Sequence, residues 1–84
     1  MKAKKMFDKL GFKKESDNEC IIKYIRHWKY GIKKYETIIT FHIEDAKYID
    51  LYKVDENYNI RADIFNINRY LLKAISKQAK ELGW

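Results

Sequence analysis

Residues 66–84, NINRYLLKAISKQAKELGW, decide the fold that we predict for this chain. Asn66 can cap the start of a helix, because its side-chain oxygen accepts from free backbone N–H groups of the first turn. Gly83 can take the left-handed conformation that ends a helix and returns Trp84 to the last turn, near Ala79. Between these signals, spacings of three and four place one stripe on a single helix face. The stripe consists of Ile67, Leu71, Ala74, Ile75, Gln78 and Leu82, widened by Leu72 and Ala79.

Residues 2–10 predict a second, shorter helix. Gly11 and Phe12 follow it in the same way that Gly83 and Trp84 follow the first stretch. Two helices that end alike are expected to pack side by side. The face of the shorter helix that we expect to be buried carries Ala3, Met6, Phe7 and Leu10.

Three strands are expected between the helices, over residues 20–30, 35–43 and 47–54. Residues 35–43 alternate most clearly. Pairing Phe41 with Ile49 and Ile39 with Leu51 gives one apolar face for the helices. A slip by one residue would bury Asp50 at a cost of several kcal/mol, roughly, unless the carboxylate were paired. On the other face, this register pairs His42 with Tyr48, Thr40 with Asp50, and Ile38 with Tyr52.

Two parts of the chain leave alternatives open. Both faces of residues 20–30 carry apolar side chains, and we favour Ile22, Tyr24 and Trp28 inward because larger side chains bury more apolar area. Residues 58–65 predict either a short fourth strand or an extended approach to the last helix. Residues 15–19 are expected to be a polar connector.

The fold class is therefore α+β, as one domain over residues 1–84. We expect a helix, an antiparallel meander of three or four strands and a C-terminal helix, with both helices on one face of the sheet. Cys20 is the sole cysteine, so no internal disulfide can form. Together with the lack of a signal-peptide or transmembrane pattern, this favours the cytoplasm and no membrane partner.

No pattern of catalytic, metal-binding or cofactor-binding residues is recognisable. His27, His42 and Glu44 are the best metal candidates, but our register places residue 27 opposite roughly residue 38, far from residue 42. Cys20 has no histidine at a local spacing that would activate it. We expect a protein that is not an enzyme and that has no metal and no cofactor.

A basic and aromatic stretch over residues 23–35 provides a nucleic-acid hypothesis. Lysines neutralise phosphates and aromatic rings stack on bases. The order of helix, three strands and helix is also that of double-stranded-RNA-binding domains, although their lysine cluster at the second helix is missing. The scarcity of arginine, three against fifteen lysines, counts against base recognition. The candidate contacts are Lys23, Arg26, Trp28, Lys29, Tyr30, Lys33 and Lys34.

Protein binding is the leading hypothesis from the sequence. If both helices cover one face of the sheet, the other face presents aliphatic and aromatic side chains. An uncovered patch of that kind is adhesive, and a two-fold dimer is the simplest way to use it. The candidate contacts on this face are Ile38, His42, Tyr48 and Tyr52.

Several segments resemble a group of small prophage proteins from low-GC Gram-positive bacteria. These segments are FDKLGF at 7–12, FHIED at 41–45, IDLY at 49–52, KAI at 73–75 and KELGW at 80–84. The resemblance implies a phage-encoded accessory protein in the bacterial cytoplasm and supplies no mechanism. The chain departs from the group in its longer approach to the last helix, at residues 62–70.

Overall fold

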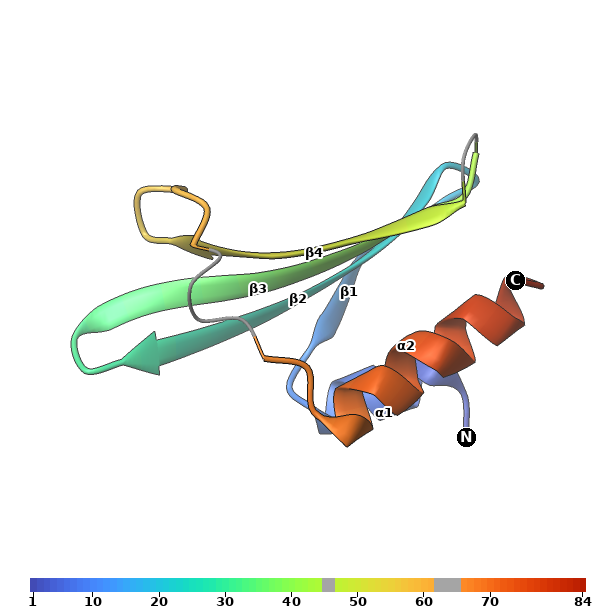
Figure 1. The fold of residues 1–84 in the computed structure, drawn as a ribbon, viewed down its shortest axis with the longest axis horizontal. Helices are drawn as coiled ribbons and strands as arrows, with labels where there is room; N and C mark the ends of the chain where they lie inside the picture. The colour runs from blue at the N-terminus through green and yellow to red at the C-terminus, as the bar shows by residue number, and fades with distance from the viewer. Residues whose placement is uncertain (45–46, 62–65) are drawn as a thin grey trace.

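The computed structural model describes residues 1–44, 47–61 and 66–84. The described chain contains α1 (Ala3–Lys9), β1 (Lys13–Asp17), β2 (Ile21–Tyr30), β3 (Lys33–His42), β4 (Tyr48–Asp55) and α2 (Arg69–Glu81). The four strands form one antiparallel sheet in the order β1-β2-β3-β4. Both helices lie on the same side of this sheet (Figure 1). The predicted α+β meander between two helices is confirmed, with four strands in the sheet.

The fourth strand is β1, which includes residues 15–17 of the segment 15–19 predicted to be a polar connector. It pairs with β2, and its register shifts between Lys14 and Ser16. Since β1 lies at the sheet edge and is composed of charged and polar residues, it shows no apolar alternation that would reveal a strand. At the other end of the chain, Ile60 forms a single bridge to Val54. Residues 62–65 of the predicted segment 58–65 lie outside the described residues.

The predicted register between β3 and β4 is confirmed at each pair that we named. Phe41 lies opposite Ile49 and Ile39 opposite Leu51, on the side of the helices. The other side pairs His42 with Tyr48, Thr40 with Asp50 and Ile38 with Tyr52. This register keeps the Asp50 carboxylate half-exposed while Phe41 and Ile39 are fully buried.

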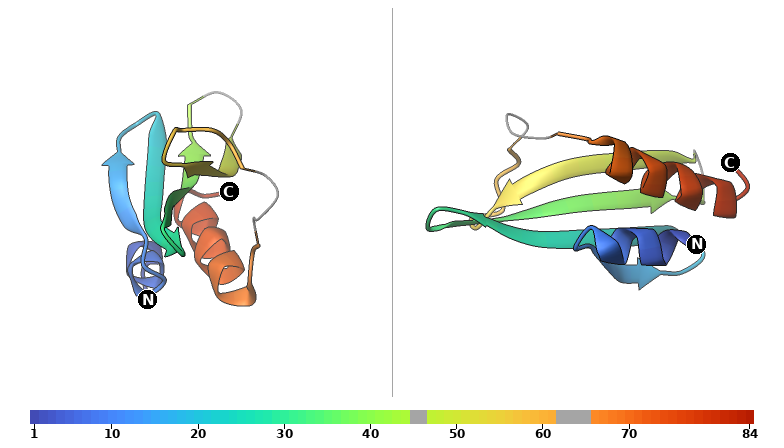
Figure 2. Two further views of the ribbon diagram at one scale, coloured as in Figure 1. Left: turned by 90° about the vertical axis from the view of Figure 1, so that its left-hand side faces the viewer. Right: turned by 90° about the horizontal axis from the view of Figure 1, so that it is seen from below.

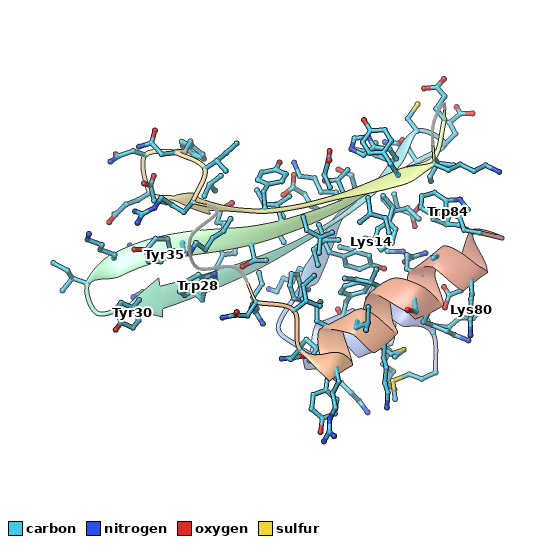
Figure 3. The ribbon with its side chains drawn as sticks, in the orientation of Figure 1. Lys14, Trp28, Tyr30, Tyr35, Lys80 and Trp84 are labelled. Carbon is cyan, nitrogen blue, oxygen red and sulfur yellow. The ribbon has the colours of Figure 1, made fainter. Side chains whose placement is uncertain are left out.

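The core centres on Tyr24, which joins the sheet to both helices. Its ring stacks on Phe7 of α1, with centroids 3.9 Å apart. Its hydroxyl donates to Oε1 of Gln78 on α2 over 2.6 Å, and both residues are buried. Burial is the main reason that the pKa of the Tyr24 phenol is raised, and the negative charge of Glu81 raises it further. Trp28 lies on the same side of β2 but beyond the helices, so it is only half-buried (Figure 3).

Both helices end with the predicted glycine device. Gly11 and Gly83 have φ values of +87° and +80°. The backbone N–H of Phe12 donates to the carbonyl of Phe7, and that of Trp84 to the carbonyl of Ala79. These bonds satisfy carbonyl groups that a helix end leaves free. Trp84 packs near Phe41, which attaches the end of α2 to the sheet.

The start of α2 differs from the prediction. Asn68, and not Asn66, caps the helix, because its side-chain oxygen accepts from the backbone N–H groups of Tyr70 and Leu71. Ile67 therefore precedes the helix and is 48% exposed. Leu72 is 56% exposed and does not widen the buried stripe.

The two helices run side by side in opposite directions, and we call them together the helix layer (Figure 2). The backbone N–H of Ala3, in the first turn of α1, donates to Oε2 of Glu81 over 2.7 Å. A carboxylate at the start of a helix is favourable because that end carries partial positive charge. This contact fixes the antiparallel alignment of α1 and α2.

Candidate functional site

The side of the sheet opposite the helix layer carries none of the described helices (Figure 1). We call it the open face. It contains the four side chains that the sequence analysis assigned to protein binding. Its members in β2, β3 and β4 alternate with the residues of the core. They include Lys23, Ile25, His27, Glu36, Ile38, His42, Tyr48, Asp50, Tyr52 and Val54.

A small apolar cluster forms the floor of the open face. Ile25, Ile38 and Val54 are each at most 9% exposed, and Tyr52 packs against them. Ile38 therefore lies at the bottom of the face and is not one of its projecting side chains. Above this floor is a hollow of about 460 Å³, whose polar border consists of Glu15, Lys23, His27, Glu36 and Tyr58.

His42 and Tyr48 form an aromatic pair at one end of the open face. Their rings stack with centroids 4.2 Å apart and an interplanar angle of 12°. Nε2 of His42 lies 2.8 Å from Oδ2 of Asp50, which holds the imidazole in place. Tyr48 is 47% exposed, so the pair offers a rigid aromatic surface to a partner.

The loop after β4 borders the other end and is not among the predicted contacts. Asp55 accepts from the backbone N–H groups of Asn57 and Asn59, and these bonds hold the pKa of its carboxyl below the usual range. Tyr58 has a φ of +61° and is 79% exposed. The available signal was the Asp-x-Asn-x-Asn pattern, since Asp and Asn side chains bond to the backbone of such turns.

Tyr58 also borders a second hollow of about 300 Å³, next to the first. Its lining comes from the ends of β2, β3 and β4 and from the loop, and consists of His27, Trp28, Lys29, Lys34, Tyr35, Glu36, Asp55, Glu56 and Tyr58. His27, Glu36 and Tyr58 line both hollows. The first hollow thus lies above the apolar floor of the open face, whereas the second lies at the ends of the strands and is lined from both sides of the sheet.

The basic and aromatic stretch of residues 23–35 does not form one surface. Lys23 lies on the open face, with its Nζ 3.7 Å from Oε1 of Glu15. The guanidinium of Arg26 lies on the opposite side, over the ring of Phe12 and 3.4 Å from the carbonyl of Leu10. Alternation along β2 separates the two cations, and each contacts the protein itself.

Trp28 is also held by intramolecular contacts. Its Nε1 donates to Oγ1 of Thr37 over 2.9 Å, and its ring stacks on Tyr35 with centroids 4.6 Å apart. The Nζ of Lys53 lies 5.2 Å from the Trp28 ring centroid and 5.1 Å from that of Tyr35. One face of the indole is therefore occupied by Tyr35, which reduces its use for stacking on a base.

The remaining nucleic-acid candidates lie at the tip of the β2–β3 hairpin, which extends past the helix layer (Figure 3). Lys29 lies opposite Lys34 and Tyr30 opposite Lys33. All four are exposed, Tyr30 by 76%. The stretch is thereby reduced from seven candidates to these four.

The two histidines do not meet. His27 lies opposite Glu36 and His42 opposite Tyr48, so they are six residues apart along β3. Within residues 1–44, 47–61 and 66–84, no group of three or more His, Cys, Asp or Glu residues could hold a metal ion. In the same residues, neither helix has the length and apolar character required to cross a membrane.

No protein-family model matches the chain, and neither the curated proteins nor the solved structures that were compared contain a match. A function for this protein must therefore be argued from its own geometry and chemistry.

Proposed function

We propose that this protein acts by binding another protein through the open face, without catalysing a reaction. The observation that carries the proposal is the hollow of about 460 Å³ above the apolar floor formed by Ile25, Ile38 and Val54. A concave apolar centre on a sheet face that no described helix covers accepts side chains of a partner and excludes water from them.

The border of the hollow matches the anatomy of a protein interface. Both signs of charge are present, from Glu15, Lys23 and Glu36. Exposed tyrosines, Tyr48 and Tyr58, flank the centre at its two ends. Interfaces between proteins have this arrangement of an apolar centre, aromatic anchors and a mixed polar rim.

A second copy of this chain is the first partner to test. A two-fold arrangement uses one patch twice, so a single adhesive face suffices for a dimer. The resemblance to small prophage proteins supplies the proposed setting, a phage-encoded accessory protein in the cytoplasm of a bacterial host.

The test compares two double variants by size-exclusion chromatography with light scattering. Tyr48→Ser with Tyr58→Ser changes two exposed tyrosines of the open face. Tyr30→Ser with Tyr70→Ser changes two comparably exposed tyrosines elsewhere and is the control. We expect the wild type and the control to form dimers at high concentration and the open-face variant to remain monomeric.

A wild type that stays monomeric at every concentration contradicts self-association. Binding to a different protein is then tested by using the wild type and the open-face variant as baits in extracts of the bacterial host. A partner that survives nuclease treatment and is lost with the open-face variant supports the proposal. A partner that is retained equally by both baits contradicts it.

A further inference from the structure

The net charge of this protein resides in its helix layer and in the residues that flank the two helices. Residues 1–12 contain four basic and one acidic residue, and residues 66–84 contain the same numbers. Residues 13–65 contain ten basic and ten acidic residues, so their net charge is zero. The helical segments therefore carry the whole net charge of +6, although they make up less than half of the chain.

The two acidic residues of the helical segments are engaged within the layer. Asp8 lies 3.2 Å from Nζ of Lys4, and Glu81 accepts from the backbone N–H of Ala3. The other basic side chains are exposed, except for Lys77, which is half-buried. Among the described residues no ion pair involves any of them: Lys2, Lys5, Lys9, Arg69, Lys73, Lys77 and Lys80.

Like charges are neighbours along both helices. Lys5 and Lys9 are four residues apart in α1, and Lys73, Lys77 and Lys80 follow at spacings of four and three in α2. Such pairs destabilise a helix, because residues three or four apart lie next to each other on its surface. An anion bound across these lysines would relieve that repulsion.

We propose that the outer surface of the helix layer binds duplex nucleic acid through the phosphate backbone, without reading its bases. The basic residues of α2 extend from Arg69 to Lys80, about 16 Å at a rise of 1.5 Å per residue. The lysines of α1 lie beside them on the antiparallel helix. A broad array of cations of this kind matches a regular polyanion.

Lysine predominance favours phosphate over base recognition. Lysine binds phosphate as a point charge, whereas specific base contacts depend mainly on arginine and amides. Single strands require aromatic side chains that are free for stacking. The exposed aromatic residue of α2, Tyr70, has the guanidinium of Arg69 over its ring at 4.9 Å, so a duplex is favoured.

An acidic helix of a protein partner is the main competing ligand. A shallow groove of about 360 Å³ in the layer is lined by Met6, Leu72, Lys73, Ser76, Lys77 and Lys80. A helix bound there would contact three of the seven basic residues without acidic partners. A duplex lying across both helices reaches the others as well, which is why we favour nucleic acid.

This surface lies on the opposite side of the molecule from the open face, so the two proposals stand independently. The test measures binding to short fluorescein-labelled DNA and RNA duplexes by anisotropy, between about 50 and 200 mM NaCl. The helix variant carries Lys73→Gln, Lys77→Gln and Lys80→Gln. The hairpin variant carries Lys29→Gln, Lys33→Gln and Lys34→Gln and removes the same charge from the neutral part of the chain. Circular dichroism establishes that each variant is folded.

Each phosphate contact contributes about 0.9 to the slope of the logarithm of affinity against the logarithm of salt concentration. For three contacts, we expect the wild-type affinity to fall by at least forty-fold, roughly, over this salt range. The helix variant should bind more weakly and lower the slope by about 2.7. The hairpin variant should keep the wild-type slope. If the helix variant does not fold, Lys73→Gln with Lys80→Gln, at two exposed positions, should lower the slope by about 1.8.

Three results would overturn the proposal. The first is a wild type that binds neither duplex at the lowest salt concentration. The second is an equal loss in both variants, which would indicate attraction by net charge without a site. The third is a loss confined to the hairpin variant, which would place nucleic-acid binding on the hairpin tip.

Discussion

Tyr24 shows how one side chain connects the three parts of this small core. Its ring fills the space between the sheet and Phe7, and its hydroxyl satisfies the buried amide oxygen of Gln78. A buried polar group without a partner costs more than a made hydrogen bond contributes. Gln78 is thus tolerated on the buried face of α2 because Tyr24 lies opposite it.

Tyr24→Phe should therefore destabilise the protein by about 1–3 kcal/mol, since the Gln78 oxygen loses a buried donor. In a domain of this size that corresponds to a decrease in melting temperature of roughly 4–8 °C per kcal/mol. Thermal unfolding followed by circular dichroism measures the effect. Tyr48→Phe, at an exposed position, is the control and should leave the melting temperature nearly unchanged.

The same substitution predicts a pH dependence. The raised pKa of Tyr24 in the folded protein means that its contribution to stability is complete below pH 10, the ordinary pKa of the phenol, and is lost above it. The wild type should lose its advantage over Tyr24→Phe as the pH rises past that value. An advantage that stays constant into the alkaline range would show that the phenol is not protected by folding.

At the scale of elements, the two glycine stops make the ends of the helices definite. Gly83 has a φ of +80°, and a Cβ built there would have no atom within 4 Å. Gly11 has a φ of +87°, and a Cβ there would lie 3.4 Å from Cδ of Arg26. Backbone conformation is thus the reason for glycine at position 83. At position 11, a side chain would also lie close to Arg26.

Gly83→Ala should cost about 1–2 kcal/mol, because left-handed backbone is unfavourable for a residue with a Cβ. Gly83→Asn should cost less, since asparagine enters this region more readily. Chemical denaturation of both variants separates the two. Equal costs for Ala and Asn would indicate that something other than backbone conformation requires glycine at this position.

At the scale of the whole molecule, the excess of positive charge and the concave apolar surface lie on opposite sides. The helix layer and its flanking residues carry the net charge, and the open face carries the hollow above the apolar floor and the aromatic pair. Two binding surfaces of different chemistry would allow one small protein to hold a protein partner and a polyanion together.

The uncompensated charge of the helix layer predicts a salt dependence of stability. The repulsion within each of the two like-charge pairs in α2 costs about 0.2–0.5 kcal/mol and should be screened by added salt. The wild-type melting temperature should therefore rise by about 2–8 °C between low and high NaCl concentration. The helix variant should lose most of this rise. The hairpin variant removes only the repulsion between Lys29 and Lys34 on paired strands and should lose less of it. The same rise in all three proteins would indicate that salt stabilises the protein by strengthening the burial of apolar surface, and not by screening these lysines.

Prediction from sequence succeeded where a local pattern had one physical solution. The register of β3 and β4 followed from Asp50, because the alternative would have buried a carboxylate beside Ile39. It failed where neighbouring residues were chemically equivalent. Asn66 and Asn68 cap a helix equally well, and the chain begins α2 after the second. The open face was predicted, but its hollow and the position of Tyr58 were not.

By itself, the sequence determined the two helices, their glycine stops and the faces of β3 and β4, because periodicity and chain stereochemistry act between near neighbours. The tertiary structure decided the rest. It turned the charged segment Lys13–Asp17 into an edge strand by offering it β2 as a partner. It also divided the basic stretch 23–35 between two faces and a hairpin tip, and placed two distant helical segments side by side. Long-range contacts set these features. Residues 66–84 therefore predict the buried stripe of α2, but not the cationic surface that the outer side of α2 forms together with α1.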